Sequence, residues 1–465
     1  MNTQHELMDE INGTIKIDLE RSDYADKVEQ ILRDYRKKAD MPGFRKGHVP
    51  MGMIKKLYGT SVLVNEVNQK LSEEIDKYIN ENALRVLGSP LPEENQSIEL
   101  DVNKMGDLSF SYKIGLAPEI EFTASDKIKF TEHKILIDDE LIDKYADDIR
   151  RRYGKFSEVD EAGENDMLGG EFVEYLGGEE VQGGIRNKST IALEFLENEN
   201  LKNQLLGLTK GESIIVDPNE VSKGKDDLMK MLNISTAQVE EISNEFNFTV
   251  ETIYHAEPAE LDQDFFDKLY GKDEVADEAG FREKIREELQ KQFAQYEDVM
   301  LYRLIKEDLV KKVNPTLPDE FLKEFLAKSN EEMTEDQLET EYPKYAEGVR
   351  WNLIEEKIVK DNGLQIQQEE LTNYVKEQMR KQFAMYGQPE VGEDLLNSTT
   401  QNILANQEEA KKLFEELYFQ KMMDFFRSTF KLKEKEVSYD DFVKLATGET
   451  PKKGILNTIS NLFGQ

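Results

Sequence analysis

The most distinctive stretch of this chain is Gly43-Phe44-Arg45-Lys46-Gly47-His48-Val49-Pro50, which is basic within a strongly acidic protein. The whole chain has 60 Lys and Arg residues against 96 Asp and Glu residues, a formal net charge of -36. Residues 33–56 have the opposite sign, with eight basic side chains, two acidic ones and a net charge of +6. The acidic remainder already supplies solubility, so a local reversal of this size predicts a surface that binds an anionic partner. Structured RNA and an acidic protein patch are the two candidates.

The elements around the basic segment would present it at the end of a helix. Apolar residues in the segment 24–35 recur at helical spacing, and Pro42 and Gly43 end that helix. Lys and Arg are favoured at a helix C-terminus, so helix capping and solvation are the alternative interpretation, although eight basic residues exceed what one helix end needs. Gly43 and Gly47 predict a tight, exposed turn that presents one aromatic ring and two cations.

The remainder of residues 1–117 predicts an α+β domain. Residues 11–19 alternate like a strand ahead of the first helix. A second helix is predicted over residues 61–87, where apolar residues share one face, and a further strand over residues 108–116. The basic segment would therefore connect two helices of an α+β domain.

The sequence Gly-Phe-Arg-Lys-Gly at residues 43–47, followed one residue later by Val49-Pro50, resembles the ribosome-docking signature of the trigger factor family. Members of this family are bacterial chaperones that meet nascent chains at the exit tunnel of the ribosome. Further segments that look like family features are Tyr58-Gly59, Gly88-Ser89-Pro90, Pro118-Glu119-Ile120, residues 258–313 and residues 367–424. The resemblance covers most of the chain and is weakest between residues 121 and 257.

The resemblance implies a function and a set of partners. It implies an ATP-independent, cytoplasmic chaperone without a cofactor, which docks on an exit-tunnel protein and ribosomal RNA and shields unfolded nascent polypeptides. The ribosome-binding residues that it implies are Gly43, Phe44, Arg45, Lys46 and Gly47. It leaves open a weak homodimer of the free protein.

Two other functions compete with this hypothesis. The first is that peptidyl-prolyl cis-trans isomerisation of folding or exported proteins is the main activity. The second is a helical scaffold that binds RNA non-specifically through the basic segment. The acidic remainder of the chain disfavours general RNA affinity, because phosphate contacts need positively charged faces.

Composition along the chain agrees with a multidomain α+β organisation in four parts. Residues 1–117 would form the α+β ribosome-binding domain, and residues 118–149 a connector. Residues 150–257 are rich in glycine and short β-like runs, which predicts a small β-rich domain that the resemblance identifies as a degenerate FKBP-like domain. Residues 258–465 predict an all-α chaperone domain with arms, because apolar residues between Phe281 and Leu304 recur every three or four positions.

In the trigger factor family the middle domain is an FKBP-type peptidyl-prolyl isomerase, whose chemistry needs no nucleophile and no metal. The barrier to rotation about an X–Pro bond is ~18–20 kcal/mol, because the amide has partial double-bond character. An apolar, aromatic pocket lowers this barrier by binding the twisted amide better than the planar one. The candidate pocket residues are Phe172, Tyr175, Val181, Phe195, Leu201, Phe246 and Phe248.

This sequence departs from the family's pocket motifs. Val181 stands where the first motif usually has an aromatic ring, and residues 198–201 replace the Ile-Pro-Gly-Phe of the second motif. A charged, helix-like insert around residues 226–245 replaces the usual flap. Either a pocket persists with aliphatic walls, or the domain is a structural spacer and auxiliary binding surface. The second interpretation is favoured, and no catalytic residue can be named.

The C-terminal half carries methionines and aromatic residues that could contact clients. A one-sided apolar stripe predicts core packing, whereas adjacent pairs such as Phe425-Phe426 spread apolar surface around a helix, since neighbours differ by ~100°. Flexible Met-rich surfaces adapt to many partners. Core packing is the favoured interpretation and client contact the alternative. The candidate client residues are Met379, Phe383, Met385, Met422 and Phe425.

Several other chemistries are excluded or disfavoured by the sequence. The chain has no cysteine, so disulfides, thiolate metal sites and thiol catalysis are excluded. The four histidines are scattered without ligand spacing, and we expect no metal site. Residues 178–183 have the glycine spacing of a phosphate loop, but Gly184-Ile185 follows in place of the Lys-Ser/Thr that the motif requires. No stretch approaches the ~18 apolar residues of a membrane span, and no basic segment with an apolar run begins the chain, so we expect a cytoplasmic protein.

Overall fold

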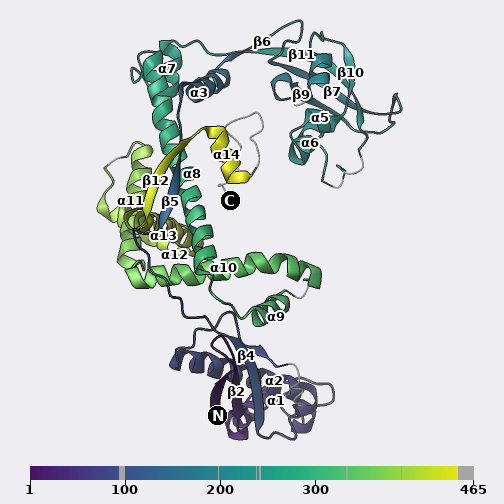
Figure 1. Ribbon diagram of the computed structural model, residues 1–465. Coiled ribbons are helices and arrows are strands. Elements are labelled where there is room, and N and C mark those ends of the chain that lie inside the picture. The colour runs from purple at the N-terminus through teal and green to yellow at the C-terminus, as the bar shows by residue number, and fades with distance from the viewer. Residues whose placement is uncertain are drawn as a thin grey trace. The chain divides into compact units, whose positions relative to one another are not determined.

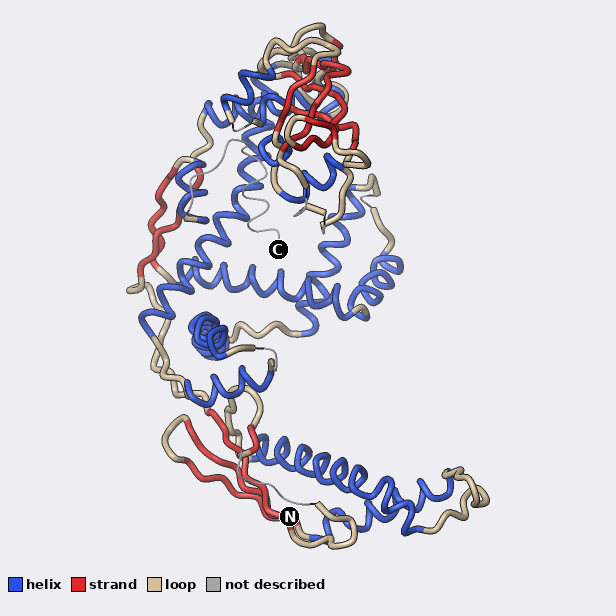
Figure 2. Tube along the Cα trace, turned by 90° about the vertical axis from the view of Figure 1, so that its right-hand side faces the viewer, coloured by secondary structure: helices blue, strands red, loops and turns tan. Residues whose placement is uncertain are grey.

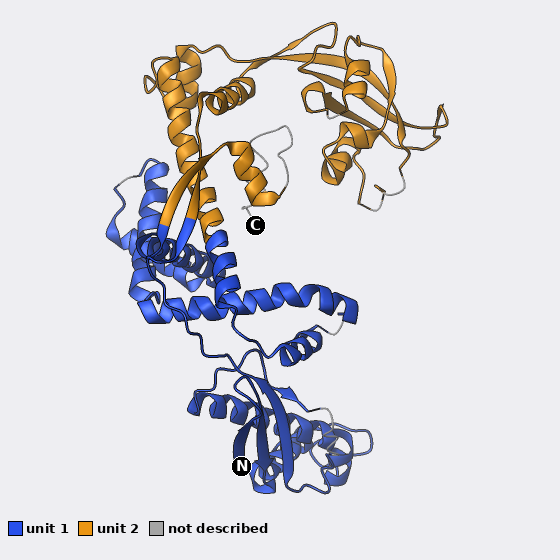
Figure 3. Cartoon of the chain, in the orientation of Figure 1, with its two compact units in different colours: residues 1–130, 303–431 blue, residues 131–302, 432–465 orange. Residues whose placement is uncertain are grey.

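The computed structural model describes residues 1–93, 100–196, 198–236, 238–239, 242–330, 333–388 and 390–448. The predicted α+β fold class is confirmed: most strands lie in the N-terminal and middle parts of the chain, and the later part is mainly helical (Figures 1 and 2). The chain forms two compact units, residues 1–130 with 303–431 and residues 131–302 with 432–465 (Figure 3). Among the described helices, none combines the length and the apolar character that crossing a bilayer requires.

The first unit begins with a four-stranded antiparallel sheet in the order β1-β2-β4-β3. Its strands are β1 (Asn2–Leu7), β2 (Asn12–Leu19), β3 (Leu91–Pro92) and β4 (Leu108–Gly115). Side chains alternate across a strand, and in β2 the alternation puts Ile15, Ile17 and Leu19 in the core with no exposed surface. The strands predicted over residues 11–19 and 108–116 are therefore confirmed.

Two helices, α1 (Arg21–Lys38) and α2 (Met51–Glu81), share this core with the sheet and lie beside β2 and β4 in Figure 1. The prediction for the second helix, residues 61–87, was wrong at both ends, because α2 begins at Met51 and ends at Glu81. Gly52 and Gly59 lower the helix propensity of this stretch. Gly59 is buried, and a Cβ atom there would come within 2.7 Å of Val102 Cγ1, so packing requires the glycine.

Helix α9 (Asp319–Ser329) packs on the N-terminal sheet within the same unit. It joins a core cluster of Leu91, Leu317, Phe321, Leu322, Tyr342, Ala346 and Leu353. A Cβ atom at Gly115 would come within 2.8 Å of Pro318 Cγ, so α9 lies directly against the backbone of β4. The Lys113 ammonium and the Glu324 carboxylate add an ion pair at 2.8 Å beside this contact.

The remaining helices of the first unit form most of its later part. They are α10 (Glu335–Asn362), α11 (Gln368–Met385), α12 (Glu393–Ala405) and α13 (Gln407–Thr429). Helix α10 begins with a capping box, in which the side chains of Thr334 and Gln337 each accept a hydrogen bond from the backbone N–H of the other. It ends at Gly363, whose φ of +64° is the left-handed conformation that commonly stops a helix.

The second unit contains a six-stranded β domain. Its strands are β6 (Lys155–Glu158), β7 (Asp166–Leu176), β8 (Glu179–Glu180), β9 (Arg186–Ala192), β10 (Ser213–Val216) and β11 (Glu245–Glu257). The strands β7 and β11 pair along most of their length and form the middle of the sheet. Short helices accompany them: η1 (Leu193–Phe195), α4 (Glu199–Leu205), α5 (Pro218–Val221) and α6 (Lys225–Leu232). The predicted charged insert is thus helical over residues 225–232 only, and residues 237, 240 and 241 lie outside the described part of the chain.

Outside the β domain, the second unit is largely helical. It contains α3 (Asp139–Arg152), α7 (Gln263–Tyr270), the first part of α8 (Glu278–Val313) and α14 (Tyr439–Thr447). Arg282 of α8 forms ion pairs with Asp139 and Asp143 of α3. These pairs connect a helix that precedes the β domain with one that follows it.

A two-stranded sheet joins segments that are about three hundred residues apart. It consists of β5 (Lys129–Ile135) and β12 (Lys431–Val437). Glu297 of α8 is almost fully buried and accepts hydrogen bonds from the Ile135 N–H at 2.8 Å and the Lys134 ammonium at 3.0 Å. Burial alone would lower the pKa of Lys134, but its contacts with Glu132 and Glu297 outweigh burial and raise it. The strand β12 was not predicted, because its sequence is mostly charged and the surrounding residues indicated helix.

Candidate functional site

The basic segment forms a compact loop, residues 39–50, between α1 and α2. Gly43 and Gly47 have φ angles of +89° and +78°, which side-chain-bearing residues rarely adopt. The loop closes on itself, because the Gly47 N–H donates to the Ala39 carbonyl at 3.2 Å and the Phe44 N–H to the Met41 carbonyl at 3.1 Å. The two glycines therefore allow the turn that holds residues 44–46 at its tip.

The end of the loop is anchored to the domain core. The Arg36 Nε–H donates a hydrogen bond to the carbonyl oxygen of Val49 at 2.9 Å. Val49 has no exposed surface and packs in the core shared by the sheet and the helices. Pro50 follows as the N-cap residue of α2. The loop is thus tied to the last turn of α1 and to the first turn of α2.

The tip of the loop presents one ring and two cations to solvent. Phe44 is 39% exposed, and Arg45 and Lys46 are exposed beside it. In the part of the chain that the structure describes, neither Arg45 nor Lys46 is in an ion pair. Nearby, Lys37 pairs with Asp34 at 2.8 Å, and this hydrogen bond lowers the pKa of Asp34. The structure brings together all five residues that the sequence analysis singled out here, Gly43 to Gly47.

An exposed aromatic and aliphatic strip lies next to the basic loop, and the sequence analysis did not identify it. Tyr35 of α1 and Tyr58 of α2 are 46% and 40% exposed, and their rings stack at 5.1 Å with an interplanar angle of 24°. Met53 and Leu57 of α2 are exposed as well. Tyr35 is the last of the apolar residues in the segment 24–35 that recur at helical spacing, a pattern that predicts burial rather than exposure. A start of α2 at Met51 would have put Met53 and Leu57 one turn apart on the surface of the helix.

In the middle domain, the candidate pocket residues divide between the core and the surface. Phe172, Phe246 and Phe248 have no exposed surface, and the rings of Phe172 and Phe248 pack at 4.6 Å. Leu201 is buried in the same core, between α4 and the sheet. Four of the seven candidates therefore fill the hydrophobic core of the domain.

The other three candidates are more accessible. Phe195 is 49% exposed, and the Lys223 ammonium lies 3.4 Å from its ring centroid, a cation–π contact. Tyr175 and Val181 are half-buried. Glu174, next to Tyr175, is occupied by hydrogen bonds from the backbone N–H groups of Ile185 and Ser243.

The candidate client residues differ sharply in exposure. Met385 at the end of α11 is 82% exposed and the following Tyr386 is 77% exposed. Met379, Phe383 and Phe425 are half-buried. Met422 has no exposed surface, because α13 turns it into the core beside Met423 and Phe426, so it does not reach the surface in this structure.

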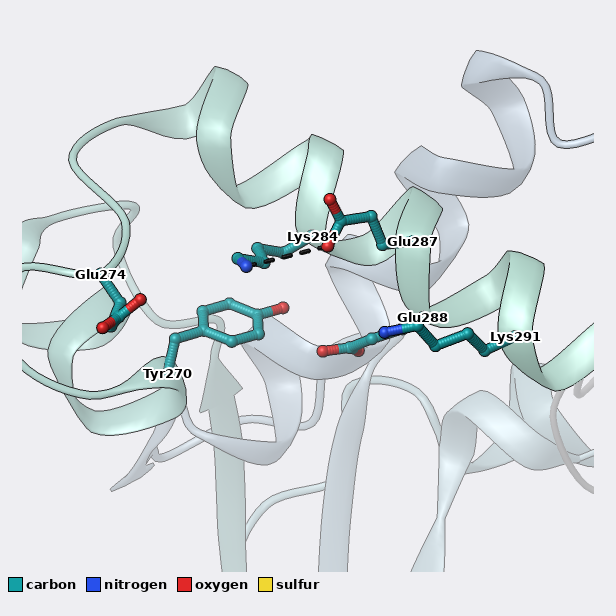
Figure 4. Close-up of a pocket in the computed structure, with 6 residues that line it drawn as sticks. All are labelled: Tyr270, Glu274, Lys284, Glu287, Glu288 and Lys291. Carbon is teal, nitrogen blue, oxygen red and sulfur yellow. Dashed lines mark ion pairs between the residues drawn. The ribbon is translucent and has the colours of Figure 1, made fainter. Parts of the chain in front are cut away.

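A small polar pocket lies between α7 and α8 in the second unit (Figure 4). Its lining residues are Tyr270, Glu274, Lys284, Glu287, Glu288 and Lys291. Burial raises the pKa of Tyr270, whose buried hydroxyl has no hydrogen-bond partner among the described residues. The pocket volume of about 200 Å³ is below the ~300–1,000 Å³ that is typical of small-molecule sites. This pocket therefore does not have the size of a substrate or cofactor site.

Comparison with protein families matches three models to successive parts of the chain. "Bacterial trigger factor protein (TF)" matches residues 1–149, "Probable trigger factor, FKBP-like domain" residues 156–258, and "Probable trigger factor, C-terminal domain" residues 309–446. Together they extend over the basic loop, the β domain and the helices α9 to α13.

Individual relatives are similar over most of their length. A trigger factor from Nitrobacter winogradskyi is 25% identical, over 96% of this chain and 98% of the relative. One from Halorhodospira halophila is 23% identical, over 94% and 96% of the two chains. A solved structure, described as "Promiscuous Substrate Recognition in Folding and Assembly Activities of the Trigger Factor Chaperone", is 14% identical with a TM-score of 0.40, over 92% of this chain and 99% of that one.

Proposed function

The chain belongs to the trigger factor family, and on that premise we propose that it docks on the ribosome through the loop between α1 and α2. Trigger factors are ribosome-associated chaperones that act on nascent chains, and this chain is one of them. The docking residues are Gly43 to Gly47. Arg45 and Lys46 supply the charge, Phe44 supplies an apolar contact, and the two glycines hold the turn.

The observation that carries the docking proposal is the exposed tip of the loop. Arg45 and Lys46 are solvated and, within the described residues, form no ion pair, so binding need not break one. The net charge of +6 over residues 33–56 in a chain of net charge -36 favours an anionic surface as partner. Ribosomal RNA and an acidic patch on a protein at the tunnel exit both supply such a surface.

We assign the other functions to the remaining parts of the chain. Residues 1–117 dock, residues 118–149 connect, residues 150–257 act as spacer and auxiliary binding surface, and residues 258–465 hold clients. The client surface includes Met385 with its half-buried neighbours Met379 and Phe383, and it excludes the buried Met422. We also propose that the protein acts in the cytoplasm and that the free protein can form a weak homodimer.

Peptidyl-prolyl isomerisation is the second candidate function, because the middle domain matches an FKBP-like family model. Against it, four candidate pocket residues lie in the hydrophobic core and Lys223 covers the exposed ring of Phe195. To bind a substrate proline, the aromatic side chains of the pocket must be accessible from the surface. The chaperone function is therefore the better supported of the two.

The proposal is tested by photocrosslinking to nascent chains on ribosomes from a translation extract depleted of other chaperones. Translation is stalled on an apolar nascent chain that carries a photoreactive residue. The complexes are then irradiated, with and without ATP, in the presence of the wild-type protein or the F44A/R45A/K46A variant. We expect crosslinks from the wild-type protein that persist after ATP is removed and are lost in the variant. Equal crosslinking by both proteins would refute docking through this loop.

A further inference from the structure

The exposed strip beside the basic loop has the chemistry of a stacking platform. The Tyr35–Tyr58 pair joins α1 to α2 with its rings nearly parallel, and each residue keeps 40% or more of its surface exposed. If the two tyrosines were core residues, their rings would be buried. If they served only to pack α1 against α2, aromatic side chains with this much exposed surface would not be needed. Exposed aromatic residues next to a charged site are typical of binding surfaces.

The charges around the tyrosine pair favour RNA over a protein partner. Lys38 lies three residues after Tyr35, and Lys55 three residues before Tyr58, so each tyrosine has a cation as its neighbour on the same helix face. Arg36 and Lys56 add two more cations close by in sequence. Aromatic rings flanked by cations match an unpaired nucleotide, which offers a planar base for stacking and a phosphate for ion pairing.

We propose that the Tyr35–Tyr58 pair stacks an unpaired base of ribosomal RNA, so that docking has an aromatic contact in addition to the basic tip. The inference rests on the proposed ribosome docking and assigns a class of partner to the surface next to that loop. In this arrangement the tip residues Arg45 and Lys46 provide the electrostatic part of the affinity. The tyrosine pair provides a contact that salt does not screen.

The two contributions have different dependence on salt concentration, which makes the proposal testable. Contacts between cations and phosphates release counterions, so the logarithm of the affinity falls linearly with the logarithm of the salt concentration. Stacking of a base on an aromatic ring releases no counterions, so its contribution to the affinity does not depend on salt concentration in this way. Removal of the tyrosines should therefore lower the affinity without changing the slope, whereas removal of Arg45 and Lys46 should lower both.

The experiment measures the affinity of the full chain for ribosomes at several salt concentrations. The variants are Y35A/Y58A, the ring-retaining Y35F/Y58F and R45A/K46A. The matched control is Tyr153→Ala, at a tyrosine that is 51% exposed and forms the C-cap of α3. We expect Y35A/Y58A to bind roughly 5- to 150-fold more weakly, as loss of base stacking would cause, with an unchanged salt slope. Y35F/Y58F and Tyr153→Ala should bind like the wild type.

A second measurement identifies the partner directly. Tyr58 is replaced by p-azidophenylalanine, which keeps the ring and reacts with RNA or protein on illumination. We expect the adduct in the ribosomal RNA, whereas adducts confined to ribosomal proteins would overturn the base-stacking assignment. Wild-type affinity of Y35A/Y58A alongside weak binding of R45A/K46A would refute this inference alone. Wild-type affinity of R45A/K46A would refute the docking proposal itself.

Discussion

Gly47 is one of two glycines that determine the backbone conformation of the proposed docking loop. Gly47 has a φ of +78°, and a Cβ atom at this position would lie 3.3 Å from the carbonyl oxygen of Lys37. Any other residue there would have to adopt the left-handed conformation and approach the last turn of α1. The conformation of the loop therefore depends on the absence of a side chain at this position.

We predict that Gly47→Ala destabilises the loop and the adjoining helix ends by about 1–2 kcal/mol, the cost of the left-handed conformation for a residue with a Cβ atom. Gly52→Ala is the matched control, because Gly52 lies in α2 with nothing within 4 Å of a Cβ atom. It should leave stability unchanged or raise it by up to ~1 kcal/mol. Hydrogen exchange of peptides from residues 36–60 in the full chain measures both effects, and wild-type protection in the Gly47 variant would contradict the prediction.

At the scale of single residues, the sequence predicted the exposed turn at residues 43–47 well, and the exposure of the candidate pocket and client residues less well. The loop is a local feature, since residue types and glycine spacing within eight positions define it. Burial of Met422 and Phe172, by contrast, depends on which helix or strand packs over them. Tyr35 has an apolar ring at a helical spacing, but it stays 46% exposed and stacks on Tyr58 of α2.

Among the secondary-structure elements, the contact between α9 and the N-terminal sheet depends on Gly115 of β4. Pro318 and Phe321 occupy the space that a side chain at this position would take. Phe325 of α9 lies close to Gly88 in the same way: a Cβ atom on Gly88 would be 3.1 Å from the Phe325 ring. Helix α9 therefore packs against backbone at two glycines. A side chain at Gly115 would force its N-terminal residues to shift, whereas one at Gly88 would need a smaller adjustment of Phe325.

We predict that Gly115→Ala loosens α9 and costs about 1–3 kcal/mol, as expected when a methyl group is forced into a packed contact. Gly106→Ala is the control, because no atom lies within 4 Å of a Cβ atom there. Hydrogen exchange should be faster in peptides of α9 for the Gly115 variant and unchanged for the Gly106 variant. Unchanged protection of α9 in the Gly115 variant would show that the contact adapts without cost.

Burial of the aromatic side chains in the middle domain leads to a prediction about peptidyl-prolyl isomerase activity. We expect the full chain to accelerate the isomerisation of a proline tetrapeptide no faster than the uncatalysed rate, because Phe172, Phe246 and Phe248 are packed in the core and cannot touch a substrate. A protease-coupled assay measures this rate. Acceleration that disappears in a Phe195→Ala variant would instead establish a pocket around that exposed ring.

The elements were predictable from sequence where their pattern is local. The alternation in residues 11–19 and 108–116 sufficed for β2 and β4, and residues 24–35 for α1. The first ten residues of α2 were missed because Gly52 and Gly59 lower helix propensity, and Val102, which packs against Gly59, is 43 residues away in the sequence. The strand β12 was missed because its partner β5 is about three hundred residues distant and its own residues are mostly charged.

For the whole molecule, the main feature is the separation of charge along the chain. A net charge of -36 keeps an apolar-binding chaperone soluble, while the +6 segment supplies the attraction to an anionic surface. The same separation disfavours binding to RNA in general, because most of the surface would repel phosphate. Ribosome binding is therefore expected to depend on a few residues, those at the tip of the loop and the tyrosine pair beside it.

The most direct test of this account is co-sedimentation of the full chain with bacterial ribosomes. Wild-type protein is compared with F44A/R45A/K46A and with a control, R152A/K155A/F156A, which removes the same exposed side-chain types from another site. The account predicts that the wild type and the control sediment with ribosomes, whereas the loop variant stays in the supernatant with its fold intact. Co-sedimentation of the loop variant at the wild-type level, or none by the wild type, would contradict it.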